Sequence, residues 1–365
     1  MKGVRVLDLT LNLPGPYATW VLASTGADVV KIEPPKGDPA RHMGHLFERL
    51  NRGKRSVVLD LRTPEGLASL HRLVAWADVL VEGFRPGVME RLGCGPAEAH
   101  ALNPRLVYCR ISAFGQEGPR RLEPGHDLNL QALTGLCHLE RDASEQPRPS
   151  VLPVADLSTS LAAVGAIAGS LLGDRDRVEL DVAMSDALLS WTWTWDAVDP
   201  GLQLDAATRT LPRGVRGMLG PLRRRLERDR LYAMPQYGLY RASDGWLALG
   251  IVDEQKFWEQ LADALGMKRS RSLTMPVRTL LGPLLRRRIA QKLRPRTVDH
   301  WLRVLGGAGV PVTPVHRIDD ALREPQFARV VRDGVVLPPI PGATVPEGPA
   351  PALGEHTDAV LGALA

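Results

Sequence analysis

The first 115 residues alternate short apolar runs with segments of helical periodicity. Strand-like runs occupy residues 4–9, 27–33, 56–61, 77–84 and 106–115. Helical patterns occupy residues 16–26, 64–77 and 86–92 between them. Strands separated by helices of this length predict an α/β fold with a parallel sheet covered on both faces.

The remainder of the chain predicts a second, smaller unit. Residues 128–172 look helical, a strand follows at 177–184, and a helix begins at Ser185. Residues 243–245 suit a β-hairpin turn, residues 253–266 predict an amphipathic helix, and residues 298–308 predict another helix. We therefore predict a large domain over 1–199, a linker over 200–230, a small α+β domain over 231–309, and a return to the large domain with an extended tail over 310–365.

Composition indicates an ordinary globular protein. Apolar residues make up 44% of the 365 positions and charged residues 24%. The N-terminus has no signal-peptide pattern, and no apolar run approaches the roughly 20 residues of a membrane span. Three cysteines without a CxxC pair suit a reducing compartment and no metal site. We expect a cytoplasmic protein that does not act in a membrane.

The net charge of +5 has much of its excess in two arginine-rich stretches, residues 213–230 and 268–296. Basic clusters can bind nucleic acid, but these have helical spacing and few aromatic residues to stack on bases. We favour solvated helix faces over a nucleic-acid partner. A moderate positive charge also suits a ligand that carries several phosphates.

Common cofactor and nucleophile motifs are absent. The segment after the first strand, residues 9–16, contains one glycine where a dinucleotide-binding turn has GxGxxG. No GxxxxGK[ST] and no GxSxG occurs in the chain. The pattern therefore gives no support to nicotinamide, P-loop or serine-hydrolase chemistry.

Four N-terminal segments carry a family resemblance. Residues 4–41, 51–66, 77–93 and 103–119, in that order, closely resemble the class III coenzyme A-transferase family, which also contains the α-methylacyl-CoA racemases. The resemblance implies a large Rossmann-like domain, a smaller domain, and an interlocked homodimer. It places the active site between the large domain of one chain and the small domain of the other.

The resemblance also implies the reactive residues. Asp156, in LPVADLSTS, matches the shared carboxylate, which is a nucleophile in transferases and a base in racemases. His126, in GHDLNLQALTG, matches the second racemase base and is followed by Asp127. A histidine has both protonation states accessible near neutral pH. The acidic partner of His126 in the small domain is best matched by Asp253, with Glu254 as the alternative.

The substrate implied by the family is a coenzyme A thioester, with no covalently bound cofactor and no metal. Arginines are the expected partners of its phosphates. The resemblance and local basic character place the following residues near coenzyme A: Arg41, Arg52, Lys54, Arg55, Phe84, Arg85 and Arg91.

Three functions stay open at this point. A racemase of 2-methyl-branched acyl-CoA thioesters is favoured by His126 and by the absence of a transferase-type glycine loop in residues 200–255. A coenzyme A-transferase is favoured by Leu130, where racemases have an aromatic residue, and by the lack of a glycine run after Asp156. The third is a paralogue that binds acyl-CoA without converting it. Asp156 could also act only as a helix cap.

Overall fold

The computed structural model describes residues 1–142, 144–198 and 201–364, with only the backbone at residues 202 and 203. The chain forms two compact units, one of Met1–Trp193 with Pro325–Ala365 and one of Thr194–Glu324. Each unit has its own apolar core. The units are therefore described separately.

The first unit is built on a six-stranded sheet of order β3-β2-β1-β4-β5-β6, in which all pairings are parallel. Register places Leu7 of β1 between Val30 of β2 and Leu80 of β4. The predicted parallel sheet is confirmed. The strands are β1 (Arg5–Leu9), β2 (Asp28–Glu33), β3 (Arg55–Val58), β4 (Val79–Glu82), β5 (Val107–Ser112) and β6 (Val178–Ala183).

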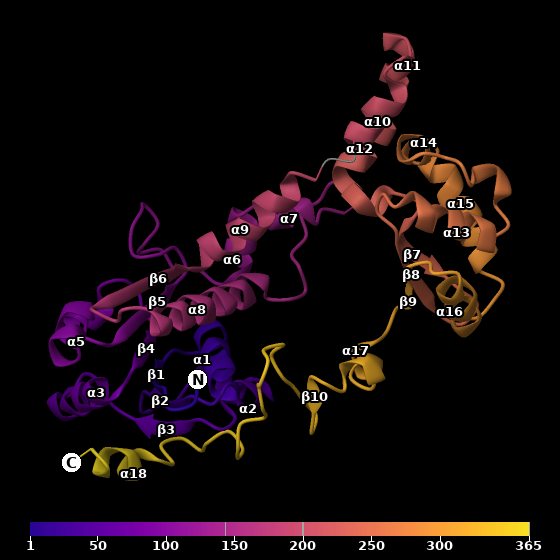
Figure 1. Cartoon of the computed structure of the whole chain (residues 1–365). Helices are drawn as coiled ribbons and strands as arrows, with labels where there is room; N and C mark the ends of the chain where they lie inside the picture. The colour runs from indigo at the N-terminus through magenta and orange to yellow at the C-terminus, as the bar shows by residue number, and fades with distance from the viewer. Residues whose placement is uncertain (143, 199–200, 365) are drawn as a thin grey trace. The chain divides into compact units, whose positions relative to one another are not determined.

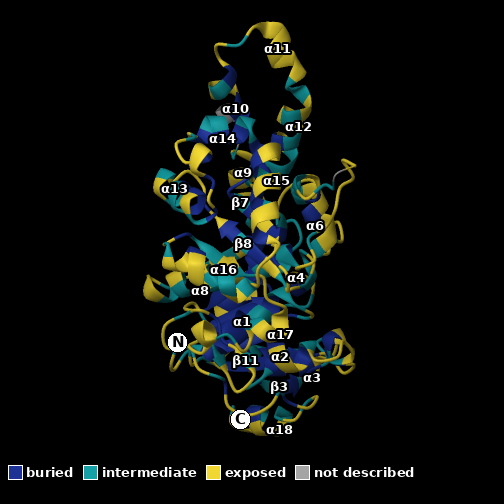
Figure 2. Ribbon diagram, turned by 90° about the vertical axis from the view of Figure 1, so that its right-hand side faces the viewer, coloured by how far each residue is buried: buried dark blue, intermediate teal, exposed yellow. Residues whose placement is uncertain are grey.

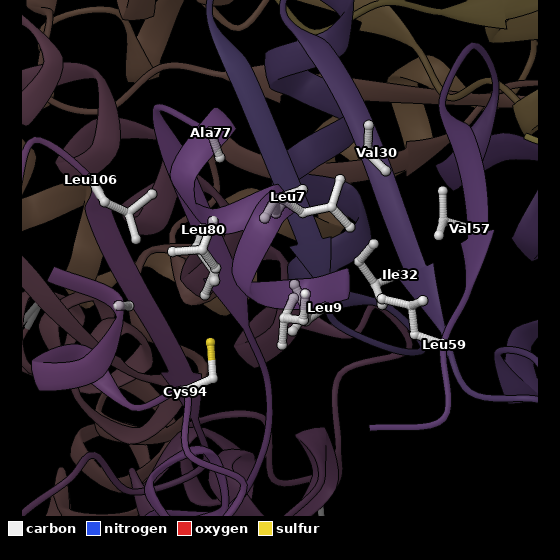
Figure 3. Packing of buried hydrophobic residues seen from close by; sticks show 14 of the residues in the cluster. Leu7, Leu9, Val30, Ile32, Val57, Leu59, Ala77, Leu80, Cys94 and Leu106 are labelled. Atoms are coloured by element: carbon white, nitrogen blue, oxygen red, sulfur yellow. The ribbon is translucent and has the colours of Figure 1, made fainter. Parts of the chain in front are cut away.

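Helices cover both faces of this sheet (Figure 1). One face, with Val6 and Val79, packs against α1 (Pro14–Ser24) and α8 (Val154–Leu172). The other face, with Leu7 and Leu80, packs against α3 (Pro64–Trp76), α5 (Pro96–Leu102) and α18 (Thr357–Gly362). Figure 3 shows Leu7, Val30 and Leu80 in that second core.

The chain between β5 and β6 differs from the prediction. Helices α6 (Asp127–Leu133) and α7 (Leu136–Leu139) are followed by a non-helical stretch before α8 begins at Val154. The helical structure predicted over 128–172 is therefore wrong for residues 134–135 and 140–153, apart from residue 143, which is outside the described chain. Pro147, Pro149 and Pro153 explain the longer break, because proline disrupts helix interiors.

Helix α8 is long and apolar enough to span a membrane by length and composition alone, with a mean hydropathy of 1.4 over its best window. This overturns the expectation that no apolar run approaches that length. Core helices pass the same test, and α8 packs against α1, β5 and β6. Among the described helices it is the one candidate.

The second unit contains an antiparallel sheet of order β7-β8-β9. Its hairpin, β7 (Tyr237–Arg241) and β8 (Trp246–Gly250), turns where the sequence predicted. Strand β9 (Val312–Pro314) pairs with β8, so this unit extends past residue 309, where the predicted small domain ended. Helices α13 (Gln255–Ala264), α15 (Gly282–Leu293) and α16 (Val298–Gly307) enclose its core.

The predicted linker over 200–230 is mostly helical where the structure describes it. Helix α11 has no buried residue and is almost wholly exposed (Figure 2). Ion pairs Arg223–Glu227 and Arg225–Asp229 have the i,i+4 spacing that stabilises helices. Helix α9 (Met184–Asp196) precedes this stretch, and the helices within it are α10 (Gly201–Thr208), α11 (Arg213–Met218) and α12 (Gly220–Asp229).

The other short elements complete the chain: α2 (Leu46–Asn51), α4 (Val88–Arg91), α14 (Met275–Leu280), α17 (Ile318–Ala321), β10 (Val331–Arg332), β11 (Val335–Val336), and the 3-10 turns η1 (Pro39–His42), η2 (Arg230–Ala233), η3 (Lys268–Ser270) and η4 (Pro325–Phe327).

Candidate active site

A cavity of about 590 Å³ opens at the carboxyl ends of β1, β4 and β5. Parallel α/β sheets bind ligands at this edge, where the strand order reverses direction, here between β1 and β4. Its polar lining is Thr10, Asn12, Ser112, His126 and Asp156. Its apolar lining is Leu11, Leu13, Pro14, Met43, Leu46, Ile111, Ala113, Pro153 and Met184. The cavity can hold a mainly apolar group beside two ionisable side chains.

Asp156 lies in the first turn of α8 and is half-buried. Its carboxylate accepts no hydrogen bond from the described residues. Burial, followed by the charge of nearby Asp127, raises the pKa of Asp156 to about 7. The carboxyl group is therefore divided between both protonation states near neutral pH.

Asp127 fixes the start of α8. Its Oδ1 accepts hydrogen bonds from the backbone N of Ala155 at 2.7 Å and of Asp156 at 3.3 Å. Its Oδ2 accepts one from Gln131 Nε2 at 2.5 Å, within α6. A carboxylate at a helix N-terminus satisfies free N–H groups and favours the helix dipole. Asp127 thereby ties α6 to α8.

His126 precedes α6 as its N-cap residue. Its backbone N donates to Asn129 Oδ1 at 3.0 Å, which fixes the turn. The ring is exposed, and the side chain of His126 lies at the backbone N–H of Asn129, with which it completes a capping box. His126 and Asp156 line the same cavity from two elements joined by Asp127. The structure thus brings together three of the four predicted catalytic residues.

Three predicted coenzyme A residues are engaged by other groups of the protein. Lys54 is 3% exposed, and its Nζ donates to Asp8, Asn51, Thr19 and the Pro16 carbonyl. The other two form ion pairs, Arg41 with Glu33 at 2.7 Å and Arg55 with Asp28 at 2.6 Å. A phosphate would have to displace these partners, and Lys54 is not accessible to one.

The remaining basic candidates are more accessible. Arg52 lies 3.7 Å from Glu48, and Arg91 is exposed but lines neither the large cavity nor the smaller pocket beside it. Phe84 and Arg85 line that smaller pocket, which has a volume of about 210 Å³. The pocket shares Gly83, Ser112, Ala113, Gly125 and His126 with the larger cavity. The two spaces therefore lie side by side.

Sequence reasoning missed Arg121, which lines the smaller pocket together with Arg85. Both arginines are exposed and have no acidic partner among the described residues. Glu123, the carboxylate in the lining, is paired with Arg120 at 2.8 Å. The pocket is therefore positively charged. No motif marks Arg121; its only sequence signal is the basic pair RR at 120–121.

Sequence reasoning also missed the buried charges beneath the β1–α1 loop. Lys31 Nζ donates to the Thr10 carbonyl at 2.8 Å and pairs with Asp38 at 2.9 Å. Asp8 accepts from the Thr10 backbone N, and Asp38 from the Asn12 backbone N. Asn12 has a left-handed φ of 64°. These bonds hold one wall of the cavity in place. The sequence feature that could have revealed these residues is the presence of charged residues within otherwise apolar strands.

Asp253 and Glu254 belong to the second unit, between β8 and α13, and both are exposed. Glu254 Oε2 accepts from the backbone N of Val252 and of Asp253. The catalytic assistance predicted for Asp253 remains a prediction. In the described parts of the chain, no group of three His, Cys, Asp or Glu could hold a metal ion.

Comparisons with known proteins place this site in a family. The sequence profile of CoA-transferase family III matches residues 1–357. The chain is 33% identical over 381 residues to mouse (Mus musculus) alpha-methylacyl-CoA racemase, covering 99% of this chain and 92% of the relative. The chain belongs to CoA-transferase family III. The predicted family is confirmed.

Other members of CoA-transferase family III match equally broadly. Succinate–glutarate CoA-transferase from Agrobacterium fabrum is 31% identical over 400 residues, covering 100% of this chain and 95% of the relative. The solved structure of a CAIB/BAIF family protein from Brucella suis aligns with a TM-score of 0.79 at 27% identity, covering 100% of this chain and 99% of that one. Racemases and transferases are thus both relatives.

Replacing Asp127 tests its capping role. Asp127→Ala should lower the free energy of unfolding by about 1–2 kcal/mol, because two N–H groups of α8 lose their acceptor. Asp127→Asn keeps that acceptor and should lose less than half as much. Urea denaturation measures both, with Asp299→Ala in α16 as the exposed control. Equal effects of all three changes would refute the cap.

Asp156 should make stability depend on pH. Its folded pKa of about 7 exceeds its unfolded value, so the folded state holds the proton more tightly. Stability should fall as the pH rises from about 4 to 7 and stay low above 7. Asp156→Asn should be more stable than wild type at pH 8 by about 2 kcal/mol, a value discounted for partial exposure.

Urea midpoints at pH 4.5 and pH 8 measure this difference, with Asp186→Asn in the first turn of α9 as the control. A gain that is the same at both pH values would contradict a raised pKa at Asp156.

Proposed function

We propose that this protein is an acyl-CoA racemase or epimerase that moves the α-proton of 2-methyl-branched acyl-CoA thioesters. The supporting observation is that the ionisable side chains of His126 and Asp156 line one cavity. Two-base racemisation requires two such groups near the α-carbon, because one removes the proton and the other returns one.

The protonation states suit this reaction. With its pKa raised to about 7, Asp156 can accept a proton at neutral pH and also return one. His126 supplies an imidazole, the side chain most often used to move protons in catalysis. For one enantiomer, the ionised Asp156 takes the α-proton and protonated His126 delivers its proton to the opposite face of the enolate. For the other enantiomer, the roles are reversed.

The lining suggests how the thioester lies. Apolar residues such as Leu13, Met43 and Met184 are suited to the branched acyl chain. The adjoining pocket, with Arg85 and Arg121, is suited to an anionic part of coenzyme A. We propose these two arginines as coenzyme A ligands and leave the enclosed Lys54 out of that set.

Replacement of these arginines tests this binding mode. Arg85→Ala and Arg121→Ala should each raise KM for an acyl-CoA about 5- to 30-fold with kcat changed less than 3-fold, because removing a phosphate contact weakens binding without touching the reacting carbon. Arg105→Ala is the control, because Arg105 is exposed and lines neither pocket. Steady-state kinetics with a full and a truncated, phosphate-free thioester measures the effect. Equal KM increases for both thioesters would contradict phosphate binding.

A coenzyme A-transferase is the second candidate. It is favoured by the succinate–glutarate relative and by the accessible carboxylate of Asp156. That carboxylate would attack the thioester carbonyl and release coenzyme A thiolate, leaving a mixed anhydride. The thiolate would then attack the aspartyl carbonyl, which frees the first acid and leaves an aspartyl-CoA thioester. An acceptor carboxylate would take up the acyl site and, by the reverse steps, leave with coenzyme A.

The quaternary structure and location are part of the proposal. We propose an interlocked homodimer in which Asp253 of one chain approaches His126 of the other, in the cytoplasm. Exposed apolar side chains on the first unit, Leu128, Leu133, Leu161, Leu189 and Trp193, supply a surface for subunit contact. A monomer by light scattering at micromolar concentration would contradict the dimer.

One experiment separates the candidate functions. We expect a single enantiomer of a 2-methylacyl-CoA, incubated in deuterated water without acceptor acid, to gain α-deuterium and lose optical purity. His126→Ala and Asp156→Asn should each reduce this at least 100-fold, because each removes one proton carrier. Asp319→Asn, an exposed change in the other unit, is the control.

The alternatives give different readouts. No exchange, together with a hydroxylamine-sensitive adduct on Asp156 when donor and acceptor are supplied, would establish the transferase. Tight coenzyme A binding with neither exchange nor adduct would indicate a binding paralogue.

A further inference from the structure

Glu82 is a buried carboxyl group that the proposed reaction does not use. It ends β4, is 4% exposed, and directly precedes Gly83, which lines both cavities. Its Oε2 accepts a hydrogen bond from the backbone N of Phe84 at 2.6 Å. The side chain thus closes a tight turn at the start of the segment that presents Phe84 and Arg85 to the smaller pocket.

The described surroundings of Glu82 do not supply an ion pair. Arg110 lies opposite Glu82 in the neighbouring strand, yet its guanidinium pairs with Glu90 of α4 and Glu179 of β6, each at 3.0 Å. The charge of Glu90 also acts on Glu82, as does Asp181 of β6, and Tyr108 and Cys109 of β5 feel the charge of Glu82. Arg110 is therefore shared among several carboxyl groups, and Glu82 is buried next to it without a direct pair.

This placement makes Glu82 unfavourable for stability. Burial raises the pKa of Glu82 to about 7, although the Phe84 N–H and Arg110 act in the opposite direction. A leucine at the end of β4 would fill a similar space without burying a charge. A residue that opposes folding but shapes a binding segment is typical of functional sites.

We propose that Glu82 is a positioning residue whose carboxylate holds the Gly83–Pro86 turn in the shape that presents Arg85 to the anionic part of the ligand. The inference rests on the proposed function, because it takes coenzyme A as the ligand of that pocket. Glu82 touches no reacting atom. It acts through the backbone of Phe84, and a charged acceptor holds that N–H more firmly than a neutral one.

Two substitutions separate positioning from structural support. Glu82→Gln keeps an oxygen acceptor for Phe84 N but removes the charge, and Glu82→Leu removes both. We expect the Kd for coenzyme A, by calorimetry at pH 8, to rise about 3-fold in Glu82→Gln and about 10-fold in Glu82→Leu. In turnover of the proposed substrate, KM should rise accordingly and kcat should change less than about 2-fold.

The second readout is stability, which needs no ligand. At pH 8 the urea midpoint of Glu82→Gln should be higher than that of wild type, and at pH 5 the two should agree, because the folded wild-type protein is protonated at Glu82 at pH 5. A residue with a purely structural role would instead lower stability when replaced. Glu98→Gln in α5 is the control, because Glu98 is exposed and does not act on Glu82.

The outcomes distinguish the two proposals. Wild-type protein that binds no coenzyme A would refute the proposed function and this inference with it. Coenzyme A binding that is unchanged in both Glu82 variants, or a lower urea midpoint of Glu82→Gln at pH 8, would overturn the role of Glu82 alone.

Discussion

The candidate site depends on one carboxylate oxygen. Oδ1 of Asp127 accepts the first free N–H groups of α8 from Ala155 and Asp156, across a separation of 28 and 29 residues. Because His126 directly precedes Asp127, the same contact fixes the position of His126 at the start of α6 relative to that of Asp156 at the start of α8. The stretch between α7 and α8 contains three prolines and has no regular structure of its own, within its described residues, to hold these helices together. The spacing of the two reactive groups thus follows from a helix cap.

Buried acids in this unit divide into two kinds. Burial alone would raise the pKa of Asp8, but Lys54 and Lys31 outweigh it and hold that pKa well below its usual range. Asp156 and Glu82 have no such cation in direct contact among the described residues, and the pKa of each is raised to about 7. The first kind stabilises the loop beneath the cavity, and the second stays able to exchange a proton near neutral pH. The carboxyl edge of the sheet therefore combines a paired carboxylate, Asp8, that stabilises the fold with two unpaired carboxyl groups, Asp156 and Glu82, whose burial opposes folding.

The sheet could be predicted well from the sequence, and the site only partly. Apolar runs bounded by turn residues locate each parallel strand, because a strand buried on both faces leaves a continuous apolar signal. His126 and Asp156 were found only through a family motif, since no periodicity brings residues 30 positions apart into one cavity. Arg121 lies in a loop without a repeating pattern, and Glu82 looks like an ordinary strand end. Lys54 shows the opposite failure. It is a basic residue in a family motif, but its charge is bound by Asp8 inside the fold, so the motif alone does not make it a ligand-binding residue.

Proton transfer and acyl transfer need different things from His126 and Asp156. A nucleophilic carboxylate requires access and a weakly solvated oxygen, and Asp156 has both whichever reaction occurs. Racemisation also requires a second proton carrier on the opposite face of the α-carbon, a role that acyl transfer does not need. The backbone of His126 is fixed by its N–H, which donates to Asn129 Oδ1, and its side chain lines the same cavity as Asp156. The two reactions therefore make the same demand on Asp156 and a different demand on His126, so a change at His126 is what tells them apart.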